Sequence, residues 1–489
     1  MASVRPREVT SLLTHPPYRA RQFWTVRGLS FVLIGVLLFL VHNVLAPQLG
    51  IYDVRLITLS LLFATLAVSL NLINGITGQF SIGHAAFYLI GAIGTAYATK
   101  SFYQPDSVLP LVWLLLMVVL GAVLAGIAGF LIGLPTLRLR GDYLAVATLG
   151  FGEIVNVFLR NQDGGVTSIG GLDLGGNYGL TQVPRLTETW HIVLLLVFTL
   201  AVARNLLKTS HGLAFLSVRE DELAADATGV NTTKIKVTAF VLGAAIAGMA
   251  GALFAHYNGT VSPDDFRMDV SFMLIAMVVI GGTGSITGAA LAGVCLKLLE
   301  ESLRRLRPIP AVDLFALIIA GALAFAAYLY LKKRGWLDID GKLRIPLTLL
   351  GGLGCAGVAY LAWLLLRADL SIVFKGVGAT LAALILIALI ATPARSGGLP
   401  RLGLLAALGF VAVQATGPLS SMLVGIGPIQ ELIGRTTYMP SDIRWAVFAL
   451  ALILTMLLRP QGVLGHHELS WSFLQRLFTG RIRAEGRVL

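Results

Sequence analysis

Long apolar segments separated by short polar loops constrain the fold of this chain more than any other feature. Apolar runs at 29–46, 55–74, 108–134 and 237–257 each approach or exceed the roughly 20 residues that a helix needs to cross a bilayer. Because unpaired backbone amides and carbonyls are too costly in lipid, such runs cross membranes as α-helices. Charged residues make up only 13% of the chain, against about 25% in soluble domains. The sequence therefore predicts an all-α polytopic membrane protein.

Further apolar segments and one glycine-rich break set the number of expected helices. Additional spans are predicted at 82–99, 142–160 and 190–207. The segment 270–303 is interrupted by glycines at 281–288. It is therefore either a broken helix that lines a transport path or two ordinary helices joined by a short turn. Lys and Arg gather in alternate loops, which explains the net charge of +12 by membrane orientation rather than by a nucleic-acid partner.

The longest strongly polar segment between two spans is 208–236. Its alanines favour a short helix over 218–228, and Gly229 can end that helix in the left-handed conformation. The apolar side chains of the segment, Leu213 and Leu223 among them, are expected to pack against the rest of the chain. A short helix held between two spans can grip a partner protein, and a solvated loop is the plainer alternative.

Short motifs rich in glycine or charge recur along the chain. They are 78–87 (GQFSIGHAAF), 137–145 (LRLRGDYLA), 148–154 (TLGFGEI), 219–222 (REDE), 229–231 (GVN), 247–253 (AGMAGAL), 262–263 (SP), 281–289 (GGTGSITGA) and 459–462 (RPQG). In order and spacing they resemble the M-type permease subunits of branched-chain amino acid ABC transporters, a family related to permeases for urea and short amides. The resemblance covers about 55–305 and 442–465. One such motif is weak evidence, and this many in order is strong evidence.

The resemblance divides the chain into parts. It implies an ABC importer permease core of about 10 spans or half-spans, together with an inserted group of about 4 spans that the family lacks. The predicted parts are a cytoplasmic N-terminal segment at 1–28, the core at 29–305, an inserted transmembrane region at 306–441, the final span of the core at 442–465 and a cytoplasmic tail at 466–489. An even number of added spans leaves the last helix on its usual side of the membrane.

The resemblance also implies that 208–236 is a coupling loop, which docks into a cleft on an ATPase subunit. Segment 222–229 (ELAADATG) is similar to the family's coupling segment, in which a pair of alanines is followed by a glycine. The family's acidic residue is displaced by one place, because Leu223 occupies its position and Glu222 lies beside it. The residues expected to couple to the ATPase are Arg219, Glu220, Glu222, Ala224, Ala225 and Gly229.

A second group of residues is expected along the substrate path. The backbone before His84 could present N–H groups at a helix N-terminus to the carboxylate of an amino acid. His84 could equally be a packing histidine, and Glu153 could line the path or form a structural pair near the membrane interface. The expected path residues are Gln79, Ser81, Gly83, His84, Glu153, Gly281, Gly282 and Ser285.

The expected function is transport rather than catalysis. The sequence has no GxxxxGK[ST] loop, so ATP and Mg²⁺ are expected to bind to partner ATPase subunits, and no cofactor or metal site is expected in this chain. The resemblance implies a multi-pass permease of a bacterial-type inner (plasma) membrane. It would import branched-chain or related amino acids with ABC ATPase subunits, a second permease subunit and an extracytoplasmic substrate-binding protein, in contact with membrane lipid. Permeation of urea or short amides is one alternative. An ion-coupled secondary transporter is another, although the core spans carry few charges for coupling.

Overall fold

The fold is known from a computed structural model, which describes part of the chain. The described residues are 50–106, 109–136, 142–162, 174–305, 309–310, 437–438 and 452. The predicted N-terminal segment at 1–28, the first predicted span at 29–46 and the C-terminal tail at 466–489 lie outside the described residues, as do nearly all of 306–441 and 442–465. The chain divides into two compact units, Met1–Val54 and Arg55–Leu489. The packing contacts described here belong to the second unit.

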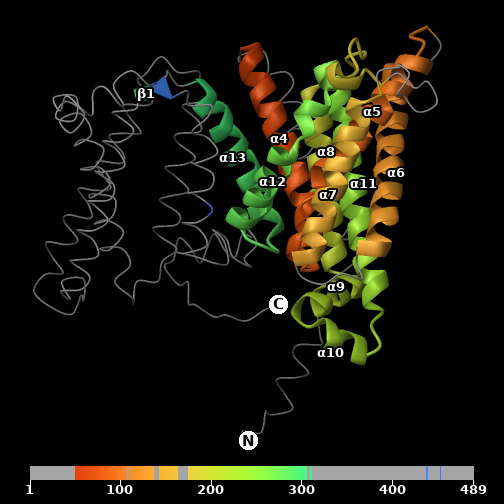
Figure 1. Ribbon diagram of the computed structural model, residues 1–489, viewed down its shortest axis with the longest axis vertical. Helices are drawn as coiled ribbons and strands as arrows, with labels where there is room; N and C mark the ends of the chain where they lie inside the picture. Colours follow the sequence, from red (N-terminus) through yellow and green to blue (C-terminus); the bar gives the residue numbers. More distant parts are fainter. Residues whose placement is uncertain are drawn as a thin grey trace, which may run out of the picture. The chain divides into compact units, whose positions relative to one another are not determined.

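The described part of the chain is built from long α-helices (Figure 1). The long helices are α4 (Ile51–Asn71), α5 (His84–Phe102), α6 (Pro110–Thr136), α7 (Asp142–Arg160), α8 (Thr189–Leu207), α11 (Thr232–Asn258), α12 (Met268–Gly281) and α13 (Ile286–Arg305). The short elements are the π-helical turn η2 (Leu72–Ile76), the 3₁₀ turns η4 (Gly176–Tyr178) and η5 (Pro263–Phe266), and the helices α9 (Ser210–Glu220) and α10 (Glu222–Ala227). Among the described residues, 5 helical stretches are long and apolar enough to cross a membrane: Ile51–Ile76, Pro110–Leu134, Tyr143–Arg160, Thr189–Leu207 and Thr232–Asn258.

The spans predicted between 55 and 257 each correspond to a helix of the structure. The helix at 82–99, α5, is not among the five stretches that are long and apolar enough to cross a membrane. The bounds differ most clearly at α11. The sequence predicts a span at 237–257, whereas the helix begins at Thr232. Asn231 is its N-cap, and the side-chain oxygen of Asn231 accepts a hydrogen bond from the Lys234 amide at 2.9 Å. A polar first turn is compatible with helix once it is capped in this way. Helix α11 therefore extends beyond its apolar part into the predicted coupling loop.

Helix α11 lies between α5 and α6 at the centre of the bundle, where glycines bring the backbones together. A Cβ atom at Gly248 would lie 2.1 Å from the Gly121 carbonyl oxygen on α6, and one at Gly91 on α5 would lie 2.4 Å from the Gly248 carbonyl oxygen. Small residues permit this close approach of helices in lipid, where packing rather than the hydrophobic effect holds helices together.

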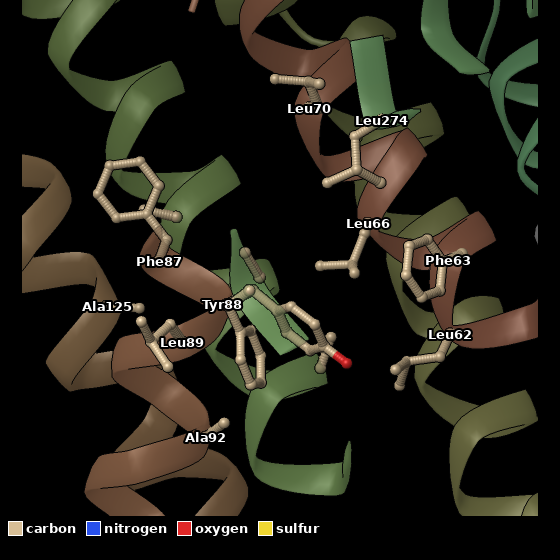
Figure 2. Close-up of a cluster of buried hydrophobic side chains, with 14 of the residues drawn as sticks. Leu62, Phe63, Leu66, Leu70, Phe87, Tyr88, Leu89, Ala92, Ala125 and Leu274 are labelled. Atoms are coloured by element: carbon tan, nitrogen blue, oxygen red, sulfur yellow. The ribbon is translucent and has the colours of Figure 1, made fainter. Parts of the chain in front are cut away.

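Larger side chains fill the space between the helices. Figure 2 shows Leu62, Leu66 and Leu70 of α4 facing Phe87 and Tyr88 of α5, with Ala125 of α6 and Leu274 of α12 nearby. Each of these side chains is less than 3% exposed. By contrast, only 28% of the residues in the apolar window of each span are buried in α6, α7 and α8. Helices α6 and α7 carry many exposed leucine, valine and isoleucine side chains. Their outer faces therefore suit contact with lipid or with another membrane subunit.

A short strand pair closes the predicted insertion. Strand β1 (Ile309–Pro310) pairs with β2 (Thr437–Tyr438) in antiparallel register, with Ile309 opposite Tyr438 and Pro310 opposite Thr437. The two ends of the predicted region 306–441 are therefore adjacent. The helical membrane class is confirmed in the part of the chain that the structure describes. The total number of spans and the boundaries of the parts stay predictions.

Candidate coupling site and substrate path

The predicted coupling helix is two helices rather than one. The sequence predicts a single helix over 218–228, whereas α9 ends at Glu220 and α10 begins at Glu222. Between them, Asp221 has an extended backbone and its carboxylate accepts hydrogen bonds from the amides of Leu223 at 2.9 Å and Ala224 at 3.1 Å. A carboxylate in this position is a strong N-cap. Asp221 therefore stops one helix and starts the next.

The end of α10 follows the sequence prediction. Gly229 has a left-handed backbone with φ of +87°. The Val230 amide donates to the Ala225 carbonyl oxygen at 3.1 Å, and the Gly229 amide donates to the Asp226 carbonyl oxygen at 2.9 Å. Glycine adopts this conformation without the steric cost that other residues meet. The turn returns the chain to the start of α11.

Two leucines are exposed on α9 and α10, where the sequence predicts packing. Leu213 is 69% exposed and Leu223 is 67% exposed, so that expectation was wrong for both. Phe215 and Val218 are the apolar side chains of α9 that are buried, and Ala225 is buried on α10 at 3% exposure. The helix pair thus carries two exposed leucines, one on each helix, and buried Ala225 contributes to holding α10 against the chain. Helices α9 and α10 lie beyond one end of the long helices (Figure 1).

Two ion pairs involve the predicted coupling residues, and one of them joins two helices. Glu222 Oε1 lies 2.6 Å from Lys236 Nζ, and the Lys236 side chain is only 11% exposed. Arg219 Nη2 lies 2.8 Å from Glu220 Oε1, and Glu220 is largely exposed. The first pair joins α10 to the first turns of α11. The second leaves Glu220 at the surface while Arg219 extends toward the bundle.

The predicted path residues before α5 occupy the segment between η2 and that helix. Ser81 and His84 are fully buried, and His84 Nε2 lies 2.7 Å from the hydroxyl oxygen of Ser69 on α4. Within the described residues, Gln79 Oε1, Ser81 Oγ and His84 Nδ1 have no hydrogen-bond partner. A Cβ atom at Gly83 would lie 2.2 Å from the Thr148 carbonyl oxygen of α7, so α5 begins in close contact with α7.

Gly281, Gly282 and Ser285 form the turn between α12 and α13. Gly281 and Gly282 are buried, and Gly282 and Gly284 have φ angles of +117° and +92°. A Cβ atom at Gly281 would lie 2.4 Å from the Gly288 carbonyl oxygen, so the two helices cross with their backbones in contact. The segment 270–303 is thus two helices joined by a tight turn, and its place along a transport path stays a prediction. The turn meets α4 at its last residue, Asn71, whose side chain donates to the Ser285 carbonyl oxygen at 3.0 Å.

Glu153 lies apart from these residues, on α7. It is partly exposed, and its carboxylate makes no hydrogen bond or ion pair within the described part of the chain. The predicted structural pair is therefore not seen there.

Asn71 is a buried polar residue that the sequence predictions did not include, although an asparagine at the end of an otherwise apolar run is a visible signal that a polar partner is needed.

Several helices that are long and apolar enough to cross a membrane, with the helix pair α9–α10 between two of them, place the chain among the helical membrane proteins. The sequence profile of the family described as "Branched-chain amino acid transport system / permease component" matches residues 52–328. This is more than half of the chain, and the chain belongs to that family. The match extends past residue 305, the predicted end of the core.

Relatives from the same family support the assignment. The chain is 36% identical over 286 residues to the high-affinity branched-chain amino acid transport system permease protein LivM of Salmonella typhimurium, covering 52% of this chain and 64% of that protein. It is 37% identical over 277 residues to LivM of Escherichia coli, covering 51% of this chain and 63% of that protein. The match to a probable LivM of Methanocaldococcus jannaschii is 27% identical and covers 48% of this chain and 76% of that protein. The chain thus spans less than two thirds of the first two relatives. No solved structure matches the chain.

Proposed function

We propose that the chain is the membrane-spanning permease subunit of an ATP-driven importer. The observation that carries this proposal is the helix pair α9–α10, which presents exposed Leu213 and Leu223 to a partner. Arg219 and Lys236 tie the same pair to the bundle. An ATPase subunit that closes on ATP could then push on α9 and α10, and the bundle would switch between outward-open and inward-open states.

The partners follow from the same proposal. ABC ATPase subunits bind ATP and Mg²⁺ and dock on α9–α10. The exposed apolar faces of α6, α7 and α8 leave room for a second permease subunit and for lipid. An extracytoplasmic binding protein delivers the substrate on the opposite side of a bacterial inner membrane, which the chain crosses several times.

Branched-chain or related amino acids are the proposed substrates. The names of the LivM relatives support this class, and urea or a short amide is the alternative within related permeases. Coupling to an ion gradient is less well supported. On α13, Lys297 is already paired with Glu300 at 2.7 Å, so this cation is less available for moving an ion.

A growth experiment tests the function and the substrate class together. A strain that requires leucine, isoleucine and valine and lacks its other importers should grow on low concentrations of these amino acids only when this gene and those of its partners are present. A matched strain that requires urea as its nitrogen source should gain nothing. Growth rescue on urea with none on leucine would overturn the proposed substrate class.

A further inference from the structure

Asn71, the last residue of α4, binds the turn between α12 and α13 through both the donor and the acceptor of its side-chain amide. Its Nδ2 donates to the Ser285 carbonyl oxygen at 3.0 Å, and its Oδ1 accepts from the Gly284 amide at 3.0 Å. Asn71 is fully buried. A buried amide that uses both its donor and its acceptor on one turn fixes the position of that turn closely.

Gly75 brings the same two segments into backbone contact. A Cβ atom at Gly75 would lie 2.4 Å from the Gly284 nitrogen and 1.9 Å from Asn71 Oδ1, so a larger residue does not fit. Gly75 lies in η2, which is a π-helical turn. Such turns are rare and frequently occur at functional sites.

Arg219 reaches η2 from the coupling helices. Its Nη1 donates to the Gly75 carbonyl oxygen at 3.1 Å. Its Cγ lies 2.9 Å from the position that a Cβ atom of Gly78 would occupy, and Gly78 has a left-handed backbone with φ of +70°. Helix α9 is therefore in direct contact with η2, which is in direct contact with the turn between α12 and α13.

A second connection runs beside the first. Gln79 Nε2 donates to the Lys236 carbonyl oxygen at 3.4 Å, and Lys236 Nζ pairs with Glu222 of α10 at 2.6 Å. Both coupling helices are thus attached to the segment that follows α4, one through Arg219 and one through Lys236.

We propose that Arg219 and Asn71 form a mechanical link through which the coupling helices move the turn between α12 and α13. The inference rests on the proposed function, because it takes an ATPase as the source of the movement. When α9 shifts, Arg219 displaces η2 at Gly75, and Asn71 carries the displacement to Gly284 and Ser285. Both are positioning residues, since they act through hydrogen bonds to other segments and not on the substrate.

The first measurement uses the unmodified transporter, assembled with its ATPases, second permease and binding protein. Amide hydrogen exchange at 281–288 is compared with and without a non-hydrolysable ATP analogue. The link predicts that nucleotide binding changes exchange at this turn. In an assembled Arg219→Ala transporter the nucleotide should no longer change it. Unchanged exchange at 281–288 in the unmodified transporter, with a change at 210–227, would overturn the link.

The second measurement is the number of ATP molecules hydrolysed per substrate transported. Arg219→Ala and Asn71→Asp should keep ATP hydrolysis but raise this ratio by roughly fivefold or more, as expected for lost coupling between two sites. Arg219→Lys keeps a donor for the Gly75 carbonyl and should fall between Arg219→Ala and the unmodified protein. Lys100→Ala removes one positive charge from the exposed last turn of α5, outside the coupling loop, and should leave the ratio unchanged.

The two proposals fail in different ways. If the unmodified transporter shows no ATP-dependent uptake, the proposed function is wrong. If it imports substrate and assembled Arg219→Ala and Asn71→Asp transporters keep its ATP ratio, the function stands and the link is overturned. A loss of protein amount with an unchanged ratio per assembled transporter would likewise assign these residues a structural role only.

Discussion

Leu223 is 67% exposed on α10, where its neighbours in sequence are Glu222 and Ala224. If an ATPase cleft receives this side chain, Leu223→Asp should weaken the complex by about tenfold or more, because a buried leucine contributes about 1.5–3 kcal/mol. The amount of ATPase that co-purifies with the chain measures this. Asp226→Asn, an exposed change on the same helix, is the control and should retain the partner. Equal recovery from Leu223→Asp and Asp226→Asn would show that α10 docks through other atoms.

Asp265 lies in η5, outside the spanning segments, and burial raises its pKa above the ordinary value of 3.8. The charge of Asp264 adds to the rise in pKa, while Arg55 and Lys297 oppose it. The folded protein therefore binds this proton more tightly than the unfolded chain does. The associated stability is present below the unfolded pKa and is lost as pH rises through the folded pKa.

Asp265→Asn should therefore match the unmodified protein at about pH 3, below the unfolded pKa, and have the higher midpoint of thermal unfolding at about pH 7. Unfolding in detergent at the two pH values measures this. A lower midpoint for Asp265→Asn at the higher pH would mean that the ionised carboxylate is stabilised by Arg55 and Lys297 after all.

At the scale of single residues, local backbone conformation is easier to predict from the sequence than contacts between distant residues. Gly229 is predictable because a helix end that needs a left-handed backbone selects glycine. The need of Asn71 for a polar partner is visible in the sequence, but the identity of that partner is not, since Gly284 and Ser285 lie more than 200 positions away and only the packed fold brings them together. The exposure of Leu213 and Leu223 is not predictable either. An apolar side chain in a short helix can face a partner as readily as the chain's own core.

At the scale of helices, α11 is held by glycine contacts on two sides. Gly248→Ala places a methyl group 2.1 Å from the Gly121 carbonyl oxygen and 2.5 Å from Ala125 Cβ. We expect it to destabilise the protein by about 1–3 kcal/mol, as overpacking does. Gly150 on α7 has nothing within 4 Å of its Cβ position, so Gly150→Ala should change stability by less than about 1 kcal/mol.

Thermal unfolding of the two variants in detergent compares them directly. Equal midpoints for Gly248→Ala and Gly150→Ala would show that α11 moves away from α6 at little cost, against the close packing described for it.

Helix positions are the most predictable part of the fold. Spans such as 142–160 and 190–207 follow from apolar length alone, because lipid leaves the backbone few alternatives to helix. The start of α11 at Thr232 and the break at Asp221 depend on side-chain caps within a polar segment, where helix and loop differ little in free energy.

At the scale of the whole molecule, the strand pair β1–β2 suggests how the predicted insertion can be removed. Pro310 and Thr437 are directly opposite in an antiparallel pair, so a two-residue Asn-Gly loop can replace 311–436. Four predicted spans are lost, an even number, and a tag after Leu489 should stay in the cytoplasm. We expect partial uptake with the partner subunits. A truncated chain that inserts and assembles normally but transports nothing would place the insertion in the transport path.

The most direct test of the account is leucine uptake into proteoliposomes that contain this chain with its ATPases, second permease and binding protein. The account predicts uptake that requires ATP and the binding protein, continues after ion gradients are dissipated and is lost in the Leu223→Asp chain. Uptake that persists without ATP but stops when a proton or sodium gradient is collapsed would contradict it.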